Sequence, residues 1–141
     1  DVNKCAQMDV AGYCAKWGDI KHLQKYADFN NSDVEYNINY KAARHHRIEV
    51  IEWIDETRGE SSSAVINRCS GAVKSRDISL LKILGRNGVL VMDQTDRTTV
   101  IDDLLYLWCT TKRDWLVWQQ YAVESNDVEM IAALQQHALA S

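Results

Sequence analysis

The feature that most constrains the fold of this chain is a short template that occurs four times. Each copy has two small residues, a polar turn and then an apolar residue. The copies are Cys14–Ile20, Ala42–Ile48, Ala72–Ile78 and Ala122–Val128. Each copy opens an apolar stripe with helical spacing, at Ile20/Leu23/Tyr26, Ile48/Ile51/Ile54, Ile78/Leu81/Leu84 and Val128/Ile131/Leu134. A unit that recurs in this way predicts a stacked array of helix–turn–helix repeats.

The turn residues suit a helix that ends and a second helix that begins. Three copies place aspartate before the second helix, where its carboxylate can accept hydrogen bonds from the unpaired amides of the first turn. These residues are Asp19, Asp77 and Asp127. The preceding residue is expected in the left-handed conformation that closes the first helix. Gly18 and Asn126 suit that conformation, whereas His46 and Arg76 suit it less well.

The template predicts one all-α domain over residues 1–141, with about eight or nine short helices in antiparallel succession. The repeats are expected at about 5–30, 33–58, 62–88 and 97–141. Helices are expected to begin at Asn31–Asp33 and at Ser61–Ser63. The last repeat is longer than the others and is expected to contain one extra helix.

The C-terminal third departs from the even spacing of the first three repeats. Gly85–Gly88 is the clearest break in the helical pattern. We expect Val89–Met92 to form an extended loop whose apolar side chains pack against the array. Beyond this loop, three helices are expected near residues 97–110, 113–124 and 127–139.

Composition excludes several classes of protein. The net charge of −4 argues against a general nucleic-acid binder, and no apolar run is long enough to span a membrane. The four cysteines have no metal-type spacing, and Cys14 and Cys69 are expected to be small buried side chains. This use of cysteine indicates a reducing compartment inside a cell. Because the chain starts at Asp1, we expect a processed product or a piece of a longer chain.

The segment Ala42–Ile54 resembles an ankyrin repeat, whose pattern is Ala-Ala-x-x-Gly-His-hydrophobic-Glu-Val-Val-Lys-Trp-Leu. Gly18–Ile20 and Asn126–Glu129 are similar to the same stretch. The likeness is to divergent repeats of large DNA viruses and microbial effector families. The chain departs from the family where Thr-Pro-Leu-His should stand, for example at Asn67–Ser70. The resemblance implies an ankyrin-like helical array, and a plainer α-solenoid without β-hairpin fingers is the alternative.

In ankyrin-type arrays the two residues after the small pair line a concave binding surface. Carried over to this chain, the resemblance implies a partner-binding ridge made of Lys16, Trp17, Arg44, His45, Lys74, Ser75, Glu124 and Ser125. The first three pairs begin with a cation, which suits an acidic or phosphorylated segment of another protein. Trp17 is the best candidate for an exposed aromatic anchor. The alternative is a set of solvated polar turns with no partner.

No pattern in the sequence points to catalysis. His45 and His46 stand between Arg44 and Arg47, and the alternatives are a polar turn, a partner-contacting patch or a metal site. Adjacent histidines point in different directions from a helix end, so binding one metal ion through both is awkward. Asp102 and Asp103 lack a lysine or histidine at useful spacing. We therefore expect no enzyme activity, no metal and no cofactor.

The sequence and the resemblance together predict a non-enzymatic protein–protein interaction module. The resemblance implies a viral or pathogen factor that binds a host protein in the host cytoplasm, without nucleic acid or membrane. The alternative is a structural or assembly subunit that associates with itself through a Trp-rich face. Trp115 and Trp118 share one apolar stripe with Tyr121 and are expected in the core. The sequence does not determine the oligomeric state, and a monomer is favoured.

Overall fold

The computed structural model describes residues 2–59, 62–86, 101–102, 105, 109 and 111–140. Within these residues there are eight helices and no strand, which confirms the all-α class. The helices are α1 (Val2–Trp17), α2 (Ile20–Tyr26), α3 (Ser32–Arg44), α4 (Ile48–Arg58), α5 (Ser62–Lys74), α6 (Ile78–Arg86), α8 (Lys112–Glu124) and α9 (Val128–Ala140). Helix α6 continues through Gly85 and so extends into the expected break. The expected loop Val89–Met92 and most of the expected helix near 97–110 lie outside the described residues.

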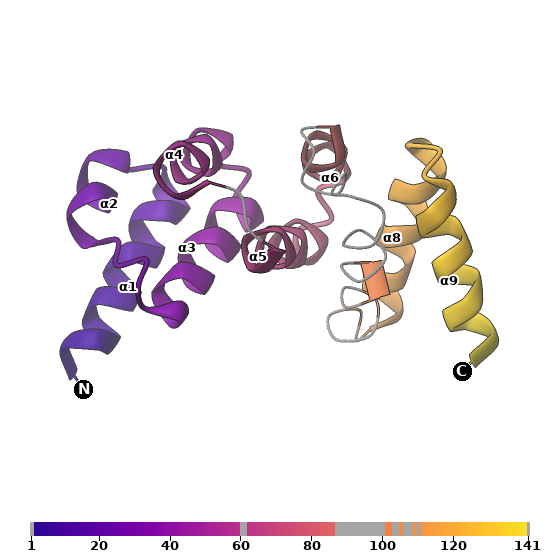
Figure 1. Cartoon of the computed structure of the whole chain (residues 1–141), viewed down its shortest axis with the longest axis horizontal. Coiled ribbons are helices and arrows are strands. Elements are labelled where there is room, and N and C mark those ends of the chain that lie inside the picture. The colour runs from indigo at the N-terminus through magenta and orange to yellow at the C-terminus, as the bar shows by residue number, and fades with distance from the viewer. Residues whose placement is uncertain are drawn as a thin grey trace.

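The helices are arranged as pairs that follow one another along the molecule (Figure 1). Each pair joins its two helices at one copy of the template: α1 with α2, α3 with α4, α5 with α6, and α8 with α9. The first helices α1, α3 and α5 pack side by side, and α8 packs against α5 and α6. The α1–α2 and α8–α9 pairs lie at opposite ends of the row.

All four turns close the first helix with the same two backbone hydrogen bonds. The residue after the turn donates its N–H to the carbonyl of the first small residue, in the pairs Asp19–Cys14 (2.9 Å), Arg47–Ala42 (2.7 Å), Asp77–Ala72 (2.8 Å) and Asp127–Ala122 (2.9 Å). The residue that precedes this donor gives its own N–H to the carbonyl of the second small residue and adopts a positive φ. These residues are Gly18 (72°), His46 (56°), Arg76 (56°) and Asn126 (51°). This is the Schellman end of a helix, and it occurs even where the residue is not glycine.

Three of the turns also cap the second helix as the sequence predicts. The carboxylates of Asp19, Asp77 and Asp127 accept the N–H groups of His22 (3.2 Å), Leu80 (3.0 Å) and Met130 (3.2 Å). Arg47 takes the place of aspartate in the second pair and provides no side-chain cap. Its Nε instead donates to the backbone carbonyl of Lys16 at 2.8 Å. That carbonyl is one of those that a helix end leaves unpaired, so Arg47 links the first two turns.

Small residues are required because the first helices approach one another closely. Ala15, Ala43 and Val73 are buried, and so are the residues before them. At Gly71 of α5, a Cβ would lie 2.4 Å from the backbone carbonyl oxygen of Tyr40 on α3. No side chain fits at that separation. The apolar stripes of the second helices complete one continuous core with the first helices.

Arg68 is a fully buried charge in this core, and the sequence analysis did not identify it. It stands four residues before Ala72, a position that Ile38 and Trp118 fill in other pairs. Its Nε donates to Asn39 Oδ1 at 2.8 Å, and its Nη2 lies 2.8 Å from Asp55 Oδ1 as an ion pair. The network therefore joins α5 to α3 and α4. Within the described part of the chain, Nη1 has no hydrogen-bond partner, and the contact of Nη2 with Asp55 Oδ1 is an ion pair without hydrogen-bond geometry.

We expect Arg68→Ala to lower the free energy of unfolding by about 3 kcal/mol, because it removes the partner of two polar groups and opens a cavity. Arg68→Met keeps most of the apolar volume and should lose less. Urea denaturation of both variants measures this difference. A loss from Arg68→Met as large as that from Arg68→Ala would contradict the volume argument.

Candidate functional site

All eight residues of the predicted ridge lie at the C-terminal ends of first helices. None of them is buried, although the small pair that precedes each of them is, with Val123 as the exception. Trp17 is the most prominent, with 56% of its surface exposed. The Schellman turn explains this arrangement, because it holds the small pair in the core and leaves the next two positions at the surface.

A group of cations surrounds His45 at the ends of α1 and α3. Partial burial, together with Lys16, Arg44, Lys41 and Arg47, holds the pKa of His45 below its ordinary value. We call these five residues the cationic cluster. Lys16 comes from the first pair and the other four residues from the second, so three of the eight predicted ridge residues, Lys16, Arg44 and His45, belong to this cluster. Lys41 and Arg47 are members that the ridge prediction did not include.

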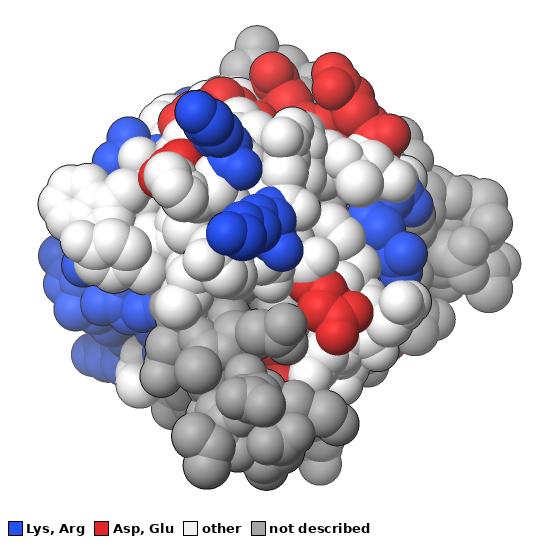
Figure 2. Space-filling model, turned by 90° about the vertical axis from the view of Figure 1, so that its left-hand side faces the viewer, with Lys and Arg blue, Asp and Glu red and all other residues white. Residues whose placement is uncertain are grey.

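The positive charge of the cationic cluster is not neutralised within the described residues, where none of its members forms an ion pair. Lys16 Nζ lies 5.5 Å from the centre of the Trp17 ring, and Arg44 Nη1 donates to the Tyr40 hydroxyl at 2.9 Å. Aromatic contacts of this kind leave the charge in place. Figure 2 views the α1–α2 end and shows a group of basic side chains at the left edge, with further basic side chains near the centre and the right.

The C-terminal half of the ridge differs from the expected row of unpaired cations. Lys74 Nζ lies 3.1 Å from Oδ2 of Asp114, a buried carboxylate on α8. Glu124 pairs with Lys82 at 2.6 Å and accepts from Gln120, and the hydrogen bond from Lys82 lowers its pKa. The hydroxyl of Ser75 bonds to backbone carbonyls of its own helix. Lys74 and Glu124 thus join the last two pairs of helices and are not available as unpaired charges.

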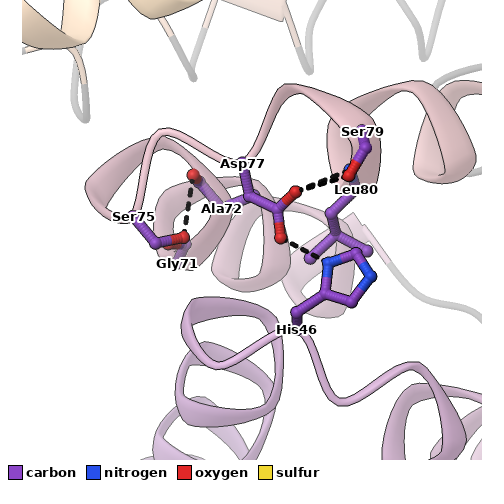
Figure 3. A network of polar contacts seen from close by, with 7 residues as sticks. All are labelled: His46, Gly71, Ala72, Ser75, Asp77, Ser79 and Leu80. Atoms are coloured by element: carbon purple, nitrogen blue, oxygen red, sulfur yellow. Dashed lines mark hydrogen bonds and ion pairs between the residues drawn. The ribbon is translucent and has the colours of Figure 1, made fainter.

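His46 makes a contact between the second and third turns (Figure 3). Its Nδ1 lies 2.5 Å from Asp77 Oδ2, while Asp77 Oδ1 accepts from the Ser79 hydroxyl and from the N–H of Leu80. Burial alone would raise the pKa of Asp77, but these three hydrogen bonds outweigh it and leave the pKa below its ordinary value. The sequence signal for this contact was a histidine in a position that favours glycine.

The metal alternative for the two histidines has no ligand set to support it. In the described parts of the chain, no three His, Cys, Asp or Glu side chains come together as a metal site. His46 is bonded to Asp77, and His45 stands among cations that would repel a metal ion.

An apolar groove lies between α8 and α9 at the other end of the molecule. Its volume is about 300 Å³, and its lining is Gln119, Ala122, Val123, Ile131, Leu134 and Gln135. The two tryptophans that the structure describes in this region, Trp115 and Trp118, do not form an exposed face. Trp118 is buried edge-on against Tyr121, and Trp115 is partly buried beside His137.

Comparisons with protein-family models, curated proteins and solved structures find no significant match to this chain. Among the described helices, none is long and apolar enough to cross a membrane. The surface chemistry of the cationic cluster and of the apolar groove is therefore the basis for inferring function.

The lowered pKa of Asp77 gives a pH dependence with a defined sign. A carboxyl whose pKa is lower in the folded state stabilises the fold above its ordinary pKa of about 4. That stability is lost as the pH falls through the lowered value. We expect the unfolding free energy of the wild type to exceed that of Asp77→Asn at neutral pH and the two to converge in acid. Urea denaturation over a pH series measures this, and a constant difference down to the lowest pH would contradict it.

Proposed function

We propose that this chain is a non-enzymatic interaction module, an ankyrin-like helical array that binds an acidic or phosphorylated segment of another protein. The observation that carries the proposal is the cationic cluster, Lys16, Lys41, Arg44, His45 and Arg47, with no ion pair among the described residues. The whole chain has a net charge of −4, so the cluster stands out against an acidic protein. A surface of this kind attracts and orients a negatively charged partner.

The cluster offers two kinds of contact to such a partner. The Arg44 guanidinium can hold a carboxylate or phosphate through two parallel hydrogen bonds, whereas Lys16 and Lys41 act as point charges. Trp17 stands beside Lys16 and offers a large aromatic surface that a partner could cover. A bound anion would favour the protonated form of His45, whose pKa the cations now lower.

Two observations support the ankyrin-like part of the proposal. Helices α1, α3 and α5 pack side by side, and the four turns have the same two backbone hydrogen bonds. The resemblance to ankyrin repeats is the basis for proposing that the chain is a viral or pathogen factor that acts on a host protein in the cytoplasm. The assembly alternative through a Trp-rich face has less support, because Trp118 is buried.

Binding should depend on the charge of the cationic cluster. We expect Lys16→Glu with Arg44→Glu to abolish binding of an acidic or phosphoserine peptide and to leave the far-ultraviolet circular dichroism unchanged, because exposed charges contribute little to stability. Lys21→Glu with Lys25→Glu on α2 makes the same change of net charge away from the cluster and is the matched control. Fluorescence anisotropy with acidic, phosphorylated and neutral forms of one peptide measures this. Binding that neither salt nor the cluster reversal weakens would overturn the proposal.

Trp17→Ala should act on a different step of binding. Charge reversal removes long-range attraction and should slow association, whereas loss of an aromatic contact should mainly speed dissociation. Stopped-flow mixing with the same peptide separates the two rate constants. An association rate that falls while the dissociation rate stays constant would mean that Trp17 is not an anchor.

A further inference from the structure

The exposed apolar residues are concentrated at the two ends of the helical array. Among residues with described side chains, the large apolar ones that are exposed are Val10, Tyr13, Trp17, Leu116, Val123 and Val128. The first three belong to α1 and the last three to α8 and α9. The described residues of the inner pairs, α3 to α6, contribute none. Outer faces of end repeats are ordinarily polar, so exposed apolar residues there indicate an interaction surface.

One exposed residue of the α8–α9 end, Val123, occupies a position that the inner pairs bury. Val123 is 72% exposed, whereas its equivalents Ala43 and Val73 are buried. In the interior, the next first helix covers this position, since Gly71 of α5 lies directly against Ala43. The α8–α9 end thus presents an uncovered copy of the surface on which α5 packs. The apolar groove beside Val123 belongs to the same surface.

The α1 end presents the opposite half of the same kind of interface. Tyr13 is 64% exposed, whereas two of its equivalents, Gly71 and Tyr121, are buried and the third, Lys41, is partly buried. In α5 this position is the one that contacts the preceding first helix, because Gly71 lies against Tyr40 and Ala43. Tyr13 and Trp17 lie one turn apart, with ring centres separated by 6.1 Å, and so form one continuous aromatic surface.

We infer that two copies of this chain stack head to tail, with α1 of one copy packed against α8 and α9 of the other. The contact continues the interface that α1, α3 and α5 already form within the chain. It is a heterologous contact, because each copy uses a different surface, and so it can add further copies or close into a ring. It goes beyond the proposed function and rests on Tyr13 and Val123, which lie outside the cationic cluster.

Two single variants and their mixture test the inference. Tyr13→Glu removes the α1 surface and Val123→Glu removes the α8–α9 surface, while Gln24→Glu adds the same charge at an exposed site on α2. Sedimentation velocity over a concentration series should show species larger than dimers for the wild type and for Gln24→Glu. Each of the other two variants alone should sediment as a monomer, with unchanged circular dichroism.

The mixture of the two monomeric variants is the decisive sample. Each variant retains the surface that the other lacks, so an equimolar mixture should form dimers and nothing larger. A wild type that stays monomeric at every concentration would overturn the inference. So would a mixture that remains monomeric, or a Tyr13→Glu chain that still associates with itself. Val123→Glu lies at the opposite end of the array from the cationic cluster and should retain peptide binding, which separates this inference from the proposed function.

Discussion

The backbone hydrogen bond that folds each turn back onto the first small residue determines the rest of the structure. When the N–H of Asp19, Arg47, Asp77 or Asp127 reaches that carbonyl, the preceding residue must take positive φ and the second helix must begin at once. The small pair is then held where the neighbouring first helix packs, and the two residues after it lie at the surface. The core, the helix caps and the candidate binding surface are three consequences of one repeated turn.

The departures from the template provide the contacts between successive turns. Arg47 stands where the other copies have aspartate, and its guanidinium reaches the carbonyl of Lys16 in the preceding turn. His46 stands where glycine would be easiest, and its ring reaches Asp77 in the following turn. A residue in positive φ costs free energy that its contacts must offset. The second turn is therefore tied to both of its neighbours by the side chains that fit the local pattern least well.

The features that the sequence predicts depend on residues close together in the chain. The features that it does not predict are contacts between residues far apart in the chain. The caps at Asp19, Asp77 and Asp127, the starts of α3 at Ser32 and α5 at Ser62, and the exposure of Trp17 all depend on a few adjacent residues. The pairing of Lys74 with Asp114 joins residues 40 positions apart, and Arg68 meets Asn39 across 29 positions. Spacing within one helix carries no information about such partners. A buried arginine at an otherwise apolar position could be found only from the packed structure.

Gly71 is a position at which one substitution would alter the geometry of the array. A Cβ there would lie 2.4 Å from the Tyr40 carbonyl, so any other residue must push α5 away from α3. The pairs are connected in series, so a small rotation at this contact is carried to every helix that follows it. The resulting displacement is larger for helices that lie farther from this contact. One methyl group in the core would thus move the α8–α9 surface relative to the cationic cluster without touching either.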